Sequence, residues 1–189
     1  MSIVAFAVTL LLSYCCIGAA IKLVDDLHDN LRQVPGHSIL SWGITVGAAV
    51  LIDIWACIDA YTDGLALALL FGLVLTRKVD NRYFLALALT TLPFVLLPVL
   101  RVDVLLLILP MLLALAPAAA VDEALDAVGP RLRHASLQSL ARHRPIMKVV
   151  VLVLPFWGFL TVFHAIAFWG FDLAYALVGH GLRARVSKP

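Results

Sequence analysis

The sequence predicts an all-α polytopic membrane protein, a transmembrane helical bundle with about six or seven spans. Of its 189 residues, 63% are hydrophobic and only 14% are charged, whereas soluble domains are about half apolar and a quarter charged. The apolar runs also lack the two-residue alternation that is typical of membrane β-barrel strands. These observations exclude a soluble globular protein. We find no linker, so residues 1–189 are interpreted as a single integral membrane domain.

About twenty apolar residues cross a bilayer as a helix. The first apolar tract lacks a basic start and continues into acidic residues, so we interpret it as a retained span and not as a cleaved signal peptide. The third tract is short and is expected to be tilted, buried in protein or extended at its ends. Gly170 and Asp172 are expected to divide the last tract. The predicted segments are residues 2–24, 39–58, 64–76, 83–100, 104–121, 149–169 and 171–182.

The distribution of lysine and arginine predicts the orientation. If the chain crosses alternately, the connections 25–38, 77–82 and 122–148 share one face with the C-terminal tail. Every lysine and arginine except Arg101 lies on that face or at a span end beside it. Because positive residues favour the cytoplasmic side, we expect the N-terminus outside and the C-terminus in the cytoplasm, in the cell (inner) membrane.

The most informative motif is V-D-[DE]-x-x-D, which occurs at the ends of the first and fifth spans. Residues three and four apart share a helix face, so each motif presents three carboxylates as one cluster. Helix C-termini disfavour negative charge, and Mg²⁺ bound by carboxylates and substrate phosphates would compensate for it. Alternatively, the acids simply mark the water boundary. The expected metal ligands, converging on one cavity, are Asp25, Asp26, Asp29, Asp122, Glu123 and Asp126.

A short basic stretch lies between the two motifs, on the same predicted face. Its cations could bind a diphosphate. The predicted diphosphate-binding residues are Arg77, Lys78, Asn81 and Arg82. The alternative is an ordinary positive loop. Residues 131–148 form a second basic, amphipathic stretch, which is interpreted as an interfacial helix or as a lid over a phosphate site.

These motifs resemble those of the UbiA superfamily of intramembrane prenyltransferases, in which two aspartate-rich motifs at cytoplasmic helix ends bind Mg²⁺ and a prenyl diphosphate. The resemblance implies an Mg²⁺-dependent enzyme of lipid biosynthesis that acts on an isoprenoid or related lipid diphosphate, by prenyl transfer or cyclisation. It further implies catalytic roles for Asp25, Asp29, Asp122 and Asp126.

A second function class stays open. Ionisable residues inside a membrane are costly and are often functional, so a transporter or an ion- or proton-conducting protein is the alternative to the enzyme. A scaffold without catalytic activity is the third possibility. No nucleic-acid partner is expected, and the sequence does not indicate the oligomeric state. The residues that the conducting function would use are Asp53, Asp59, Asp63, His164 and Asp172.

Overall fold

The computed structural model describes residues 2–29, 36–75, 81–129, 138 and 145–186. The elements in these ranges are all helices, which confirms the predicted all-α fold. They are α1 (Ile3–Asp29), α2 (His37–Ile58), α3 (Ala60–Leu75), α4 (Arg82–Val99), α5 (Val102–Val128), α7 (Pro145–Val153), the 3₁₀ turn η2 (Leu154–Trp157) and α8 (Val162–Val186).

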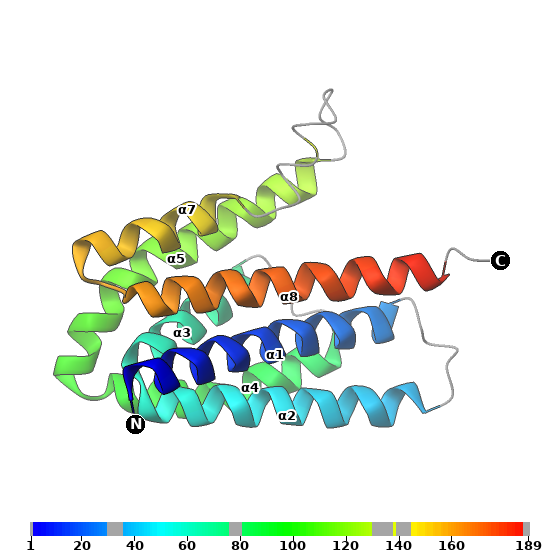
Figure 1. Cartoon of the computed structure of the whole chain (residues 1–189), viewed down its shortest axis with the longest axis horizontal. Helices are drawn as coiled ribbons and strands as arrows, with labels where there is room; N and C mark the ends of the chain where they lie inside the picture. The colour runs from blue at the N-terminus through cyan, green and yellow to red at the C-terminus, as the bar shows by residue number, and fades with distance from the viewer. Residues whose placement is uncertain (1, 30–35, 76–80, 130–137, 139–144, 187–189) are drawn as a thin grey trace.

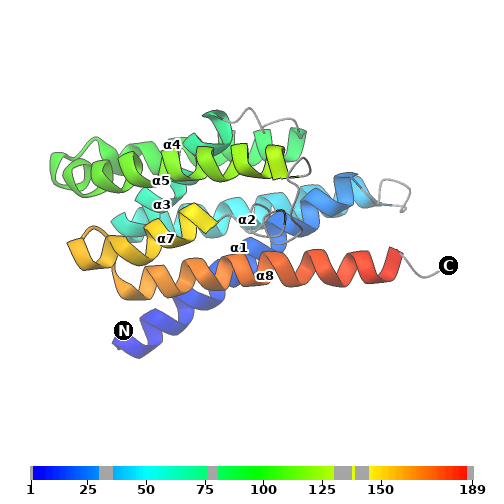
Figure 2. The same cartoon turned by 90° about the horizontal axis from the view of Figure 1, so that it is seen from above.

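Successive helices run back and forth along one bundle, so that α1 begins at one end and α8 finishes at the other (Figure 1). Helices α4 and α5 lie on one side of the bundle and α8 on the opposite side (Figure 2). The most extensive contacts join α1 to α8, α3 to α5, and α2 to both α4 and α1. The ends of α1 and α5, which carry the two acidic motifs, therefore lie at the same end of the bundle (Figure 1).

Five helices, α1, α2, α4, α5 and α8, are long and apolar enough to cross a membrane. In their most apolar windows, at most 33% of the residues are buried inside the bundle. Large apolar side chains such as Leu12, Val46 and Leu106 instead point outward, with exposed fractions above 50%. Lipid is the environment that accepts so much apolar surface, and the protein is therefore described as an integral membrane protein.

Two apolar helices are shorter than a full crossing. Helix α3 begins at Ala60, directly after α2, so its flank extends the predicted third segment as expected. Helix α7 and η2 together end at Trp157, where Gly158 adopts a left-handed φ of 75°. Such a backbone favours glycine because a side chain would be strained there.

The predicted division of the last tract at Gly170 and Asp172 is wrong. The chain breaks at Gly158, and α8 continues through both residues. Gly170 instead lets α8 approach α1, because a Cβ atom at this position would lie 2.6 Å from Leu11 Cδ1. The Asp172 carboxylate pairs with Lys148 Nζ of α7 at 2.7 Å. A glycine and an acid inside a helix are thus explained by packing and pairing between helices.

Helices α1 and α8 run in the same direction in close contact. Phe6 contacts His164 near the start of both helices, and Lys22 contacts Tyr175 further along both. At Gly18, an added Cβ atom would clash with the backbone carbonyl of Phe171. Small residues that allow close backbone approach are typical of helix packing in membranes.

Candidate functional site

The first acidic motif forms a buried ion cluster at the end of α1. Lys22 Nζ lies 2.8 Å from Asp25 Oδ2 and 3.1 Å from Asp26 Oδ1. These residues share a face because they are three and four positions apart. The Lys22 and Asp26 side chains are only 10% and 5% exposed, whereas Asp25 is 29% exposed. We call Lys22, Asp25 and Asp26 the Lys22 cluster; with two carboxylates and one ammonium group, it has an excess negative charge.

Helix α8 fixes the position of the Lys22 side chain. A Cβ atom at Gly179 would lie 2.9 Å from Lys22 Cε, so glycine makes room for the lysine stem. The Lys22 ammonium group lies 5.3 Å from the centre of the Tyr175 ring, within the range of a cation–π contact. The cluster is therefore built on two packed helices, while the side chain of Asp29 lies outside the described residues.

The beginning of α4 holds the described part of the predicted basic stretch. Asn81 is the N-cap of α4, and its Oδ1 accepts a hydrogen bond of 2.9 Å from the Tyr83 backbone N–H. The exposed Arg82 guanidinium donates hydrogen bonds to Tyr83 Oη at 2.9 Å and to Ser38 Oγ at 3.3 Å. Arg77 and Lys78 lie outside the described residues.

Tyr83 joins the beginning of α4 to the end of α1. Its side chain is fully buried, and its ring packs edge-on against the His28 ring at a centroid distance of 5.8 Å. It also packs against Trp42 of α2, at 5.0 Å. The first acidic motif and Arg82 consequently lie on neighbouring helix ends.

The second acidic motif has a different role in this structure. Asp122 is only 1% exposed, and its two carboxylate oxygens accept hydrogen bonds from the backbone N–H groups of Ile146 at 2.9 Å and Met147 at 2.7 Å. These N–H groups begin α7 and have no partner within the helix. The positive end of the α7 dipole thus compensates the Asp122 charge. Glu123 is half-buried, and the Asp126 side chain lies outside the described residues.

The two acidic motifs share one end of the bundle but belong to different packing pairs. Helix α1 packs mainly on α8 and α2, whereas α5 packs mainly on α3 and α7. Among the described residues, no group of three or more histidine, cysteine, aspartate or glutamate side chains is arranged to hold a metal ion. Convergence of both motifs on one Mg²⁺ site stays a prediction.

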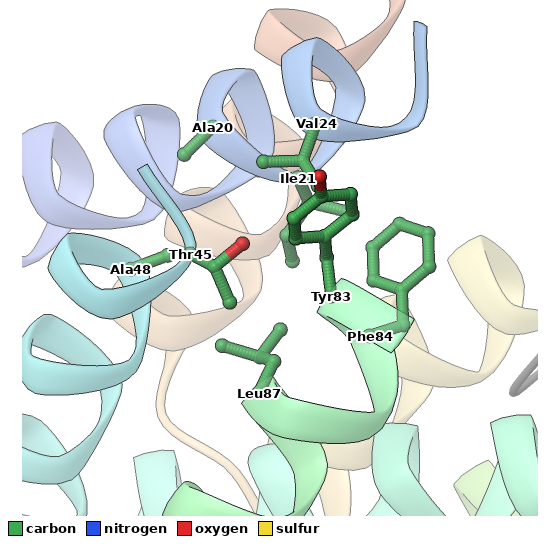
Figure 3. Close-up of a pocket in the computed structure, with 8 residues that line it drawn as sticks. All are labelled: Ala20, Ile21, Val24, Thr45, Ala48, Tyr83, Phe84 and Leu87. Carbon is green, nitrogen blue, oxygen red and sulfur yellow. The ribbon is translucent and has the colours of Figure 1, made fainter. Parts of the chain in front are cut away.

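Two apolar hollows lie inside the bundle, and Tyr83 lines the smaller of them. The smaller, of about 10 Å³, is lined by residues of α1, α2 and α4 (Figure 3): Ala20, Ile21, Val24, Thr45, Ala48, Tyr83, Phe84 and Leu87. The larger, which we call the central cavity, measures about 80 Å³ and shares Ile21 and Leu87 with the first. Its lining is almost entirely apolar; among the described residues, Tyr14, Thr62 and Thr91 contribute the hydroxyl-bearing side chains.

A second polar group, the Asp59 network, lies at the opposite end of the bundle, where α2 ends and α8 begins. His164 Nε2 is 2.6 Å from Asp59 Oδ2, and His164 Nδ1 is 2.6 Å from Thr161 Oγ1. The Thr62 backbone N–H also donates to Asp59 Oδ2 at 2.7 Å. Burial alone would raise the pKa of the Asp59 carboxyl. The hydrogen bond and charge of His164, together with hydrogen bonds from Thr62, instead hold this pKa below its ordinary value.

Asp63 lies one turn beyond Asp59 in the first turn of α3 and is fully buried. Neither of its carboxyl oxygens has a hydrogen-bond partner. Burial, and to a smaller extent the Asp59 charge, raise the pKa of Asp63 from 3.8 to about 7.

The site around Asp59 combines residues of the predicted conducting function with two threonines that the sequence analysis did not single out. Asp59, Asp63 and His164 belong to the predicted conducting function, and the structure places them at one site. Thr161 and Thr62 were missed, because hydroxyls that cap helices carry no distinctive spacing. Asp53 lies elsewhere, in α2, with Oδ1 buried and without a hydrogen-bond partner.

No family model, no curated protein and no solved structure matches this chain. The resemblance to the UbiA superfamily therefore rests on its motifs alone.

Proposed function

We propose that this protein is an Mg²⁺-dependent membrane enzyme acting on an isoprenoid diphosphate or a related lipid diphosphate. The observation that carries the proposal is the position of the Lys22 cluster. It lies at the bundle end where Arg82 begins α4, and the residue next to Lys22, Ile21, lines both apolar hollows. Helix α1 thus carries both a charged site and part of an apolar cavity, and a lipid diphosphate has a charged and an apolar half.

The ligands on α1 fit Mg²⁺ by their chemistry. This ion is commonly held by one or two carboxylates together with substrate phosphates and water. Asp25 and Asp26 supply two carboxylates on one helix face. Asp25 and Asp26 would hold the ion, which would supply positive charge to offset that of the diphosphate.

The remaining groups would act on the leaving diphosphate and the hydrocarbon chain. Arg82 is exposed and held by Tyr83 and Ser38, so its guanidinium is oriented to pair with phosphate oxygens. Loss of diphosphate from an allylic carbon leaves a carbocation, and this step needs charge stabilisation in a site that excludes water. The apolar lining of the central cavity supplies such walls.

Turnover of radiolabelled farnesyl diphosphate in micelles, with a membrane lipid extract as the source of acceptors, tests the enzyme proposal. We expect release of diphosphate with Mg²⁺ and none with EDTA. The Asp25→Asn variant should be inactive, while Asp103→Asn, which changes an exposed acid at the other end of the bundle, should retain activity. Equal release with Mg²⁺ and EDTA would contradict the proposal.

The Asp59 network favours proton conduction as a second candidate function, because it brings Asp59 and His164 into a buried pair beside Asp63. Proteoliposomes with a pH-sensitive dye inside test this function. If the protein conducts protons, the vesicles should take up protons after a pH jump. The rate of uptake should be lower with Asp59→Asn and unchanged with Asp103→Asn. Uptake no faster than in protein-free vesicles would exclude it.

A further inference from the structure

We infer that the Asp63 carboxyl is a reversible proton-binding site of the folded protein. This inference requires neither diphosphate chemistry nor proton conduction, because it concerns the bundle end opposite the Lys22 cluster. The ligand is a single proton, bound to one carboxyl oxygen and released as a hydrogen ion.

Burial is the first argument. Asp63 has an exposed fraction of 0%, and both of its oxygens lack a hydrogen-bond donor. An ionised carboxylate in such surroundings costs several kcal/mol of free energy, whereas the protonated carboxyl has no net charge to desolvate. The next residue, Gly64, lies against Met111 and Ile108 of α5, so this turn of α3 is packed against that helix.

The distribution of donors within the Asp59 network is the second argument. Asp59 Oδ2 forms hydrogen bonds with the His164 ring and with the Thr62 backbone N–H. The Tyr14 hydroxyl is used by Thr62, to which it donates at 3.2 Å. Asp63 is therefore the member of this acidic pair that a proton, and not a neighbouring side chain, neutralises.

The titratable groups facing this site come from three elements. Asp59 lies at the junction of α2 and α3, and its negative charge opposes ionisation of Asp63. His164 of α8 is paired with Asp59 and contacts the Tyr61 ring at 5.2 Å. Tyr14 of α1 is linked to this site by the hydrogen bond from its hydroxyl to Thr62. Asp59 is the partly exposed member, with 14% of its side chain accessible, so it gives the proton a route toward water.

Proton binding has a structural consequence for the central cavity. Thr62 precedes Asp63 and lines that cavity, and Leu65 and Ala66 follow in the same wall. Loss of the proton places an unpaired charge behind this wall. We expect the first turn of α3 to admit water in that state.

Infrared spectroscopy of the full-length protein in micelles tests the inference, since a protonated carboxyl has a C=O stretching band that a carboxylate lacks. At mildly acidic pH, the wild-type spectrum should contain a band that Asp63→Asn removes and Asp103→Asn retains. The same band should disappear on titration to alkaline pH and return on reversal. Asparagine has nearly the shape of the protonated acid, so Asp63→Asn is expected to fold.

Two results would overturn the inference. In the first, the difference spectrum between wild type and Asp63→Asn contains no protonated-carboxyl band at mildly acidic pH. In the second, the titration midpoint of the band stays the same in Asp59→Asn, although removal of that negative charge should move it to lower pH. Absence of diphosphate turnover would leave both measurements unaffected, so failure of the enzyme proposal is distinguishable.

Discussion

The ring of His28 packs edge-on against the ring of Tyr83, with 5.8 Å between the ring centroids. His28 belongs to the last turn of α1, and Tyr83 to the first turn of α4. This contact joins an acidic helix end to the helix end that presents Arg82, although more than fifty residues separate them in the chain. A site for a metal-bound diphosphate needs this combination of carboxylates and a cation.

Lys22→Met tests whether the carboxylates of α1 bind a divalent cation. Removal of the ammonium group takes away the positive charge that lies 3.1 Å from the buried Asp26 carboxylate, so the free energy of unfolding should fall. We expect a lower Tm in EDTA and a partial recovery with Mg²⁺, because a ligand that binds the folded state stabilises it. Differential scanning fluorimetry in micelles gives both values. If Mg²⁺ leaves the Tm of this variant unchanged, Asp25 and Asp26 do not bind the ion.

Substitutions of Asp122 separate its capping role from metal binding. Asp122→Ala removes the acceptor for the Ile146 and Met147 N–H groups and should cost about 1–2 kcal/mol. Asp122→Asn keeps one acceptor oxygen but turns its amide NH2, a donor, toward the second backbone N–H, so it should also lower the Tm. Full diphosphate turnover by Asp122→Asn would assign the residue to capping alone, whereas lost turnover in a variant that is still folded would place it in the metal site.

Glycine substitutions test the close packing of α1 on α8. Gly18→Ala places a methyl group against the Phe171 carbonyl, which is backbone and cannot move aside, so we expect a loss of about 1–3 kcal/mol. Gly47→Ala in α2 is the matched control, because nothing lies within 4 Å of its added Cβ. Alanine has the higher helix propensity, so the control should equal or exceed the wild type in Tm. Equal Tm values for the two variants would contradict this packing.

The pH dependence of stability follows from Asp63. Its pKa is raised from 3.8 to about 7 in the folded protein, so between these values the folded state binds more protons than the unfolded state. The free energy of unfolding must then fall as pH rises through this range. We expect the Tm of the wild type to decline toward alkaline pH more steeply than that of Asp63→Asn. Parallel curves for the two proteins would show that Asp63 does not titrate there.

Much of the fold could be predicted from the sequence, because apolar run length and charge placement are local properties. The boundary between the last two segments could not be predicted from these local properties. Gly170 and Asp172 have the local character of a break, but Leu11, Cys15 and Lys148 explain them as helix residues. The actual break at Gly158 lies in an apolar tract, where only the nearby Pro155 hints at it.

The candidate site could be predicted in part. Lys22, Asp25 and Asp26 form their cluster within one helix, so i, i+3 and i, i+4 spacing is sufficient to predict their shared face. The partners of Asp122 could not be predicted, because the N–H groups of Ile146 and Met147 come from another helix and leave no sequence signature. The Asp59–His164 pair likewise depends on how α2 and α8 meet.

Equilibrium binding of radiolabelled farnesyl diphosphate to the purified protein in micelles tests the central claim most directly, because it requires no acceptor. The account predicts saturable binding with Mg²⁺, loss of binding in EDTA, and at least about tenfold weaker binding by Asp25→Asn, or about 1.4 kcal/mol. Asp103→Asn should bind like the wild type. Binding that is independent of Mg²⁺, or equally tight in Asp25→Asn, would contradict a diphosphate site at the end of α1.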